Sequence, residues 1–255
     1  MAYQPSFTAA MLVIGDEILS GRTKDKNIGP LAEALTAAGI DLKEVRIIGD
    51  EPSVIANSVN TLRRSYDFVF TSGGIGPTHD DVTADAVAAA FGLPIGPHPE
   101  AYRRLAGHYA ARGIAFTEAR QRMARTPEGA ELIDNPISIA PGFRIDNVFV
   151  MAGIPAVFQA MLTAVLSALP TGMAVISVTI PCPFPEGDIG GPLSDIQARY
   201  RTVAIGSYPR FDEAAPTTEI VLRSRDEALL EAARIEVEEM IAAMSRGAPL
   251  PSLGQ

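Results

Sequence analysis

Three pairs of adjacent acidic residues, each in a loop that follows a predicted strand, are the strongest chemical feature of the chain. They are Asp16/Glu17, Asp50/Glu51 and Asp80/Asp81. The third pair follows a glycine-rich segment, residues 71–78 (TSGGIGPT). Backbone N–H groups of such a loop and of a following helix start bind anions, and glycine lets backbone approach a ligand closely. Two adjacent carboxylates beside a phosphate-binding loop indicate a bridging divalent cation.

Each acidic pair alone is also explained by solvation or by helix capping, and the glycine segment alone by a tight turn. If the three pairs meet at one edge of a sheet, beside the glycine segment, the combination favours a cation-dependent phosphate site. His79 lies inside the motif, where it could contact a phosphate, act as an acid, or be a solvent-exposed loop residue. The sequence leaves these three roles for His79 open.

The elements that would position these residues follow from the apolar pattern. The apolar run at residues 9–14 is typical of a central strand, and that at 68–70 of a strand buried on both faces. Residues 41–48 also read as a strand, and each of the three is followed by a helical pattern. Asp25 and Asn27 can cap the first helix, Pro52 suits the start of the second, and Asp80-Asp81 is expected to open the third. Alternating strands and helices predict an α/β fold with a doubly wound, mainly parallel sheet. The acidic pairs then meet at its ligand-binding edge, the carboxyl ends of the strands.

The rest of the chain predicts surface helices at 100–113 and 117–124, an irregular segment at 133–143, a strand at 147–151 and a helix from Pro155. A boundary is expected after residue 170, which gives domains 1–170 and 171–255. In the second domain, strands at 174–180, 202–207 and 217–223 and helices at 193–199 and 226–245 predict a small two-layer α+β module.

Composition excludes several classes of protein. The 255 residues carry a net charge of −9 with no Lys/Arg tract, which argues against nucleic-acid binding. The single cysteine, Cys182, excludes an internal disulfide and a cysteine-based metal cluster, and is expected to be a buried thiol. No apolar segment reaches membrane-spanning length, and the start lacks a signal-peptide pattern. We therefore expect a cytoplasmic protein that does not bind membranes.

Residues 72–88 (SGGIGPTHDDVTADAVA) resemble the signature of the molybdopterin-binding fold, the MoaB/MogA family, and more closely the amino-terminal domain of CinA-type (competence/damage-inducible protein A) proteins. Further motifs match this family in order: GDEILSGRTKDKN at 15–27, IIGDEP at 47–52, NPISIAPGF at 135–143 and MAGIP at 151–155. The family usually has Gly-Thr where this chain has Ser138-Ile139, which puts the transfer of substrate contacts in that loop in doubt. The deamidase domain of full-length CinA is expected to be absent.

The resemblance implies divalent-metal-dependent hydrolysis of nucleotide pyrophosphate bonds, as in ADP-ribose or FAD, with Mg²⁺, Mn²⁺ or Co²⁺. Asp50 and Asp81 are then expected to hold the metal or orient water, with Asp16 and Asp80 as support. The phosphate and ligand contacts expected in addition are Ser72, Gly73, Gly74, Gly76, Thr78, His79, Asn27, Pro141 and Gly142.

Two alternatives remain open. The same fold in MoaB/MogA proteins implies a molybdopterin-binding protein without hydrolase activity, and a nucleotide-binding module without catalysis is the third possibility. We also expect a homodimer, because residues 100–124 form a helical excursion carrying apolar side chains that include Tyr102, Ile114 and Phe116.

Overall fold

The computed structural model describes residues 7–211 and 216–246. The chain divides into two compact units, Met1–Met173 and Ala174–Gln255. The boundary expected from the sequence was three residues earlier, after residue 170. We describe each unit by itself.

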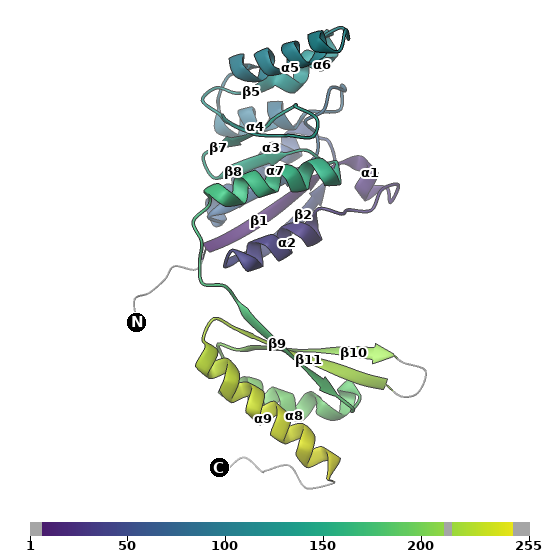
Figure 1. Ribbon diagram of the computed structural model, residues 1–255, viewed down its shortest axis with the longest axis vertical. Coiled ribbons are helices and arrows are strands. Elements are labelled where there is room, and N and C mark those ends of the chain that lie inside the picture. Colours follow the sequence, from purple (N-terminus) through teal and green to yellow (C-terminus); the bar gives the residue numbers. More distant parts are fainter. Residues whose placement is uncertain (1–6, 212–215, 247–255) are drawn as a thin grey trace. The chain divides into compact units, whose positions relative to one another are not determined.

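The first unit is built on a six-stranded sheet in the order β2-β1-β3-β8-β7-β6 (Figure 1). Strands β2, β1, β3 and β8 run parallel, and β7 is antiparallel to both of its neighbours. The prediction of a mainly parallel α/β sheet is therefore confirmed. The strands are β1 (Phe7–Ile14), β2 (Ile40–Ile48), β3 (Phe68–Ser72), β6 (Glu131–Ile133), β7 (Gly142–Ile145) and β8 (Val148–Met151).

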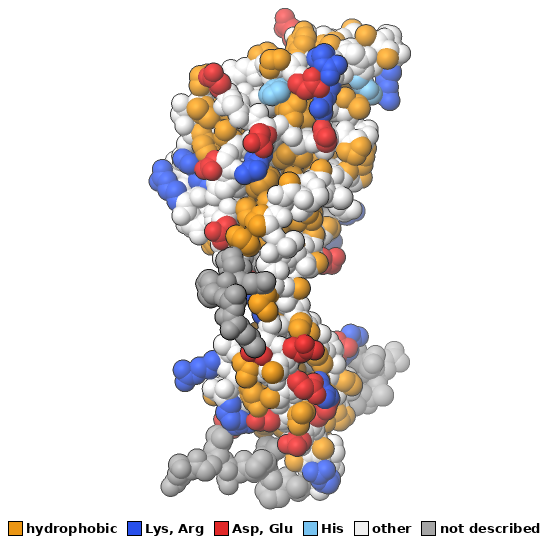
Figure 2. Space-filling model, turned by 60° about the vertical axis from the view of Figure 1, so that its left-hand side comes forward, with side chains coloured by type: hydrophobic (Ala, Val, Ile, Leu, Met, Phe, Trp, Pro, Cys, Tyr) orange, Lys and Arg blue, Asp and Glu red, His pale blue; other side chains and the backbone are white. Residues whose placement is uncertain are grey.

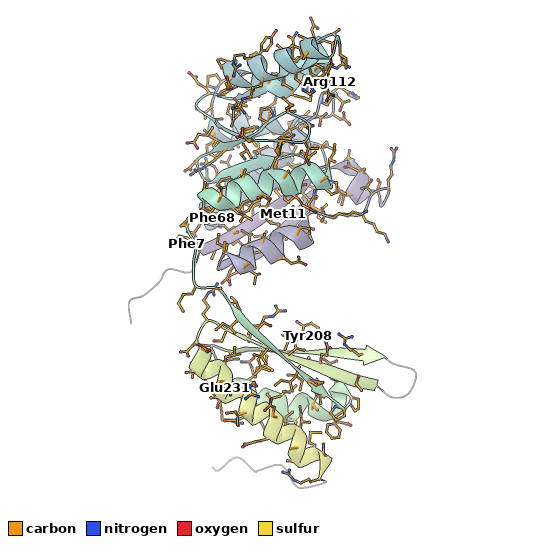
Figure 3. All side chains as sticks on the ribbon, viewed as in Figure 1. Phe7, Met11, Phe68, Arg112, Tyr208 and Glu231 are labelled. Carbon is orange, nitrogen blue, oxygen red and sulfur yellow. The ribbon has the colours of Figure 1, made fainter. Side chains whose placement is uncertain are left out.

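Helices cover both faces of this sheet, and β1 shows why its sequence is apolar throughout. Ala9, Met11 and Val13 face one core, with helices α2 (Ile28–Ala37) and α7 (Pro155–Ala168). The alternating residues Ala10, Leu12 and Ile14 face the other core, with α3 (Pro52–Ser65) and α4 (Thr83–Phe91). Figure 3 labels Met11 between α2 and α7, and Phe7 and Phe68 at the start of β1 and β3. The ring centroids of Phe7 and Phe68 are 5.7 Å apart. A strand between two helical layers buries both of its faces.

The helical excursion leaves the sheet after α4. It contains α5 (Pro99–Ala111), the short α6 (Glu118–Gln121), a 3₁₀ turn η1 (Arg122–Ala124) and a two-stranded ribbon of β4 (Ile95–Pro97) and β5 (Arg125–Pro127). Its apolar residues pack among themselves and against Leu132, Ile139 and Ala140. The excursion therefore has apolar partners within its own unit, although Tyr102 and Ile114 remain 37% and 40% exposed.

The second unit is a three-stranded antiparallel sheet in the order β10-β11-β9, packed on two helices. Cys182 lies in its core, as predicted, and burial raises the pKa of its thiol. No helix in the described part of the chain is long and apolar enough to cross a membrane. The elements are β9 (Ile176–Cys182), α8 (Glu186–Arg199), β10 (Ala204–Phe211), β11 (Pro216–Ser224) and α9 (Glu227–Ser245).

Candidate functional site

The glycine loop after β3 is held by contacts within the protein. Gly73 and Gly74 have φ of 109° and 69°. A Cβ on Gly73 would lie 2.2 Å from the Ile14 carbonyl oxygen, and one on Gly74 would lie 2.1 Å from the hydroxyl oxygen of Thr83. That hydroxyl is buried and donates to the Gly73 carbonyl at 3.1 Å. Packing against β1 and α4 therefore already requires these glycines, so close approach to a phosphate is not needed to explain them.

Asp81 closes the same loop and does not cap a helix. Its carboxylate accepts from the backbone N–H of Thr78 at 2.8 Å and from the Thr78 hydroxyl. Helix α4 begins two residues later at Thr83, and no side chain caps it. A Cβ on Gly76 would lie 2.6 Å from the Asp81 carboxylate, so Gly76 gives that side chain room. The prediction that Asp80-Asp81 opens the helix was wrong, because the carboxylate bonds the loop instead.

Acidic side chains meet at the carboxyl ends of β1, β2 and β3. Asp50 accepts a 2.9 Å hydrogen bond from the backbone N–H of Asp16, the first residue of α1 (Asp16–Leu19). Burial raises the pKa of Asp50, and the charges of Asp16, Glu17 and Asp80 raise it further, against the lowering effect of the Asp16 N–H. Asp50 is therefore a partly desolvated carboxylate among other negative charges.

The third acidic pair is divided between two roles. Asp80 contributes its charge to the group around Asp50, whereas Asp81 turns back to Thr78. The Thr78 hydroxyl and the backbone N–H of Asp80 itself lower the pKa of the Asp80 carboxyl, which favours the anion. The imidazole of His79 is fully exposed, 3.9 Å from the Asp80 carboxylate. No group of three or more His, Cys, Asp or Glu side chains within residues 7–211 and 216–246 could hold a metal ion by itself.

Asn27 and Ser72 lie together on the α2/α7 side of the sheet. The Asn27 amide donates to the Ser72 hydroxyl oxygen at 2.7 Å and to the Gly153 carbonyl at 2.8 Å. The carboxylate of Asp25 accepts from the backbone N–H of Ile28 at 2.8 Å. Of the two predicted caps of α2, Asp25 accepts from the first N–H of the helix. Asn27 holds the N-cap position, but its side chain joins β3 to the loop before α7 instead of capping the helix.

Two arginines that the sequence analysis did not select come to the glycine loop from the excursion. Arg122 donates to the backbone carbonyl of Asp81 at 3.1 Å, and Arg125 forms a two-bond ion pair with Asp85 of α4. With Pro141 they line a recess of about 20 Å³ beside Gly74 and Gly76. No local motif marks these arginines, because only the folding back of the excursion brings them to the loop.

Gly142, expected to contact ligand, has a structural reason to be glycine. It begins β7, where a Cβ would lie 2.4 Å from the Val150 carbonyl oxygen. In the preceding segment, the Asn135 amide donates to Ser138 and Ala140, and Ile139 has a φ of 67°. The positions that depart from the family pattern, Ser138 and Ile139, thus lie in a loop closed by one buried asparagine.

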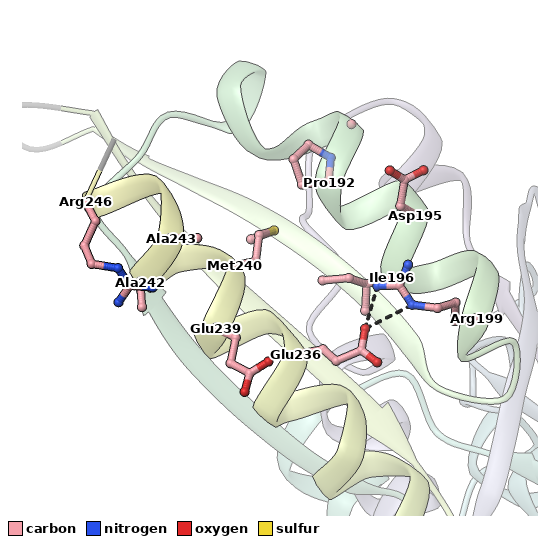
Figure 4. A pocket seen from close by; sticks show the side chains of 11 residues that line it. Pro192, Asp195, Ile196, Arg199, Glu236, Glu239, Met240, Ala242, Ala243 and Arg246 are labelled. Carbon is pink, nitrogen blue, oxygen red and sulfur yellow. Dashed lines mark hydrogen bonds and ion pairs between the residues drawn. The ribbon is translucent and has the colours of Figure 1, made fainter. Parts of the chain in front are cut away.

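A larger hollow, about 800 Å³, lies between α8 and α9 of the second unit (Figure 4). Arg199 and Glu236 form an ion pair across it, and Ile196 and Met240 supply apolar wall. None of the residues selected from the sequence lines this hollow.

Comparison with known proteins gives two family matches. Residues 10–171 match the family described as a probable molybdopterin binding domain, and residues 174–246 match the FAD synthase middle domain. The two matches correspond to the two compact units.

Relatives of this chain match it over different shares of their own length. A protein of Aeropyrum pernix is 30% identical over 94% of this chain and 92% of its own length. A probable FAD synthase of Caenorhabditis briggsae is 30% identical over 92% of this chain, but this chain spans only 49% of it. A CinA-like protein of Desulfosudis oleivorans is 35% identical over 64% of this chain and 41% of its own length.

Among solved structures, the protein CinA of Thermoplasma acidophilum is similar with a TM-score of 0.59 and 28% identity. The likeness covers 64% of this chain and 98% of that one.

Proposed function

We propose a function on the premise that this chain belongs to the CinA-like family of proteins with a probable molybdopterin binding domain. The proposed function of the chain is to hydrolyse the pyrophosphate bond of a nucleotide of the ADP-ribose or FAD type, with the help of a divalent cation. The second unit matches the FAD synthase middle domain, which supports a nucleotide as the ligand.

The observation that carries this proposal is the environment of Asp50. Its carboxylate lies 2.9 Å from the Asp16 backbone N–H, among three other acidic side chains. Burial and the negative charges of Asp16, Glu17 and Asp80 raise its pKa more than that N–H lowers it, so a cation would offset the cost of the ionised group. Solvation alone does not explain why acidic side chains gather at the ligand-binding edge of a parallel sheet.

The donors fit a hard cation in part. Carboxylate oxygens suit Mg²⁺ or Mn²⁺, and Mg²⁺ commonly uses one or two carboxylates together with substrate phosphates. Asp50 with Asp80 or Asp81 would hold the ion, and the diphosphate would complete its ligands. When bound, a divalent cation neutralises phosphate oxygens and favours attack by water. Asp50 would orient that water, and the Arg122 guanidinium beside the glycine loop would attract the phosphate group.

The test is hydrolysis of ADP-ribose and FAD by the purified full chain with Mg²⁺, Mn²⁺ or Co²⁺, with AMP release as the readout. We expect Asp50→Asn to reduce turnover at least 100-fold while leaving the melting temperature within about 2 °C, because removing charge stabilisation costs rate rather than fold. Glu33→Gln, on the exposed surface of α2, is the control and should keep full activity. Full activity of Asp50→Asn would contradict the assignment.

A second candidate is molybdopterin binding without hydrolysis, and the family match over residues 10–171 favours it. The pterin phosphate would occupy the same glycine loop. Tight binding of molybdopterin by the full chain, with no AMP released from any dinucleotide, would establish this candidate in place of the hydrolase.

A further inference from the structure

Asn27 has a side-chain oxygen that no group within residues 7–211 and 216–246 satisfies. The residue is 3% exposed, and its Oδ1 has no hydrogen-bond partner. The Gly153 carbonyl can only accept, so the nitrogen of the amide must face it, and this fixes Oδ1 as the free acceptor. A buried acceptor of this kind can take a hydrogen bond from a ligand or from an ordered water.

A recess opens beside this oxygen. It has a volume of about 60 Å³ and is lined by Asn27, Ser72 and Gly153. Two lysines, Lys24 and Lys26, and two acidic residues, Glu17 and Asp25, are also among its walls. Helix α7, of 14 residues, starts at this recess with Pro155, and no side chain caps its start. Lys24, Lys26 and the uncapped helix start favour an anion, against the carboxylates of Glu17 and Asp25, while Asn27 Oδ1 favours a hydroxyl or amine donor.

A second asparagine, Asn147, has the same kind of hydrogen bonds as Asn27. Asn147 also donates its amide to two backbone carbonyls, those of Arg63 and Tyr66, and its Oδ1 is also buried without a partner. Asn147 lies directly before the amino end of β8, whereas Asn27 contacts Ser72 at the carboxyl end of β3. Asn147 ties the chain together and is therefore the matched control for the structural part of Asn27.

We propose that the recess beside Asn27 binds the sugar-phosphate part of a nucleotide, with a ribose hydroxyl donating to Asn27 Oδ1 and the phosphate held by Lys24, Lys26 and the start of α7. This inference rests on the proposed function for the choice of a nucleotide. Ser72 lines this recess and Gly74 lines the recess beside Asp81, with only Gly73 between them in the chain. A dinucleotide could therefore place one end on each side of the strand edge.

Calorimetric binding of AMP, 2′-deoxy-AMP and 3′-deoxy-AMP to the full chain tests the hydroxyl. AMP contains no pyrophosphate bond, so turnover does not interfere. We expect loss of one of the two hydroxyls to weaken binding about tenfold in the unchanged chain, the scale of one unsatisfied buried group. In Asn27→Ala the three ligands should bind within twofold of one another. In Asn147→Ala, whatever its stability, the tenfold difference should persist.

Equal binding of the three ligands to the unchanged chain, or a tenfold difference that survives Asn27→Ala, would overturn the hydroxyl contact. No measurable binding of AMP would overturn the inference as a whole. If a pterin phosphate binds and AMP does not, and Asn27→Ala weakens the pterin, the donor is a pterin amine and the sugar assignment is wrong.

The phosphate is tested separately with the double variant Lys24→Ala/Lys26→Ala. AMP should bind five- to tenfold more weakly, with a smaller dependence on salt, while the hydroxyl difference remains. Unchanged AMP affinity would remove the lysines from the site. Hydroxyl discrimination in a protein that hydrolyses no dinucleotide would contradict the proposed function and leave this inference standing.

Discussion

At the scale of residues, adjacent side chains in the acidic pairs have different partners. Asp80 adds its charge to the group around Asp50, whereas Asp81 bonds Thr78 and shapes the glycine loop. The glycines of that loop are required by the carbonyl of Ile14 and the hydroxyl of Thr83. Loop geometry and charge placement are therefore separable by mutation.

Replacing Asp81 by alanine should open the loop. We expect Asp81→Ala to lower the free energy of unfolding by about 1 kcal/mol, because a loop hydrogen bond to backbone is lost. AMP release should fall at least tenfold, since the backbone N–H groups lose their arrangement. Thermal unfolding and turnover of the same preparation check this. A variant that keeps full turnover would exclude Asp81 from any part in the site.

Replacing Gly73 by alanine should destabilise the fold even without ligand. The added Cβ would meet the Ile14 backbone at 2.2 Å, and the φ of 109° is unfavourable for alanine. We expect a loss of about 2–4 kcal/mol in the free energy of unfolding, measured by urea titration. Gly107→Ala is the control, because a Cβ there meets nothing within 4 Å, and it should gain about 0.5–1 kcal/mol in helix α5. Unchanged stability of Gly73→Ala would show that the close contact is not required.

At the scale of elements, the helical excursion supplies residues that strands and loops of the core do not. It packs on its own aromatic residues, with Tyr102 and Tyr109 contacting Phe116 at ring-centroid distances of 5.1 and 5.5 Å. It also brings Arg122 to the glycine loop. Its stability should therefore affect the site through the position of that arginine.

The pH dependence of the free energy of unfolding tests the ion pairs of Glu100 in α5. Hydrogen bonds from Arg103 and Arg104 lower the pKa of Glu100 to about 2. A carboxylate with a lowered pKa stabilises the fold above its unfolded pKa of 4.5, and this contribution disappears as the pH falls toward 2. We expect Glu100→Gln to be less stable than the unchanged chain at pH 7, with the difference shrinking between pH 4.5 and 2. A difference in urea midpoint that does not depend on pH would contradict the ion pairs.

At the scale of the whole molecule, the charged side chains visible in Figure 2 are of both signs. On the face shown in Figure 2, acidic and basic side chains alternate, and no broad basic patch is visible there. With a net charge of −9, this distribution agrees with binding of a small anion at a local site rather than of a nucleic-acid backbone.

We also expect the chain to form a homodimer through the exposed part of the excursion. Tyr102 and Ile114 are 37% and 40% exposed there, and a two-fold interface would cover both. Sedimentation at micromolar concentration should show a species of twice 27.0 kDa, and Tyr102→Glu should shift it toward the monomer. A 27.0 kDa species that persists as the concentration rises would exclude the dimer.

The sequence by itself determined the α/β class, because continuous apolar runs such as residues 9–14 can be buried only between two helical layers. It also determined that the acidic pairs follow strands whose carboxyl ends meet, and that Pro52 and Pro155 begin helices. These properties depend on local periodicity and on topology, both of which can be recognised in a single chain.

Only the tertiary structure decided how individual side chains are used. Asn27 was expected to cap its own helix, yet it bonds Gly153, which lies 126 residues away, and keeps an unsatisfied oxygen. Arg122 reaches Asp81 across 41 residues, with no signal in either segment. Gly73 and Gly74 were assigned to a ligand, but β1 and α4 require them. Hydrogen-bond partners and close contacts of this kind depend on long-range packing, which local spacing does not encode.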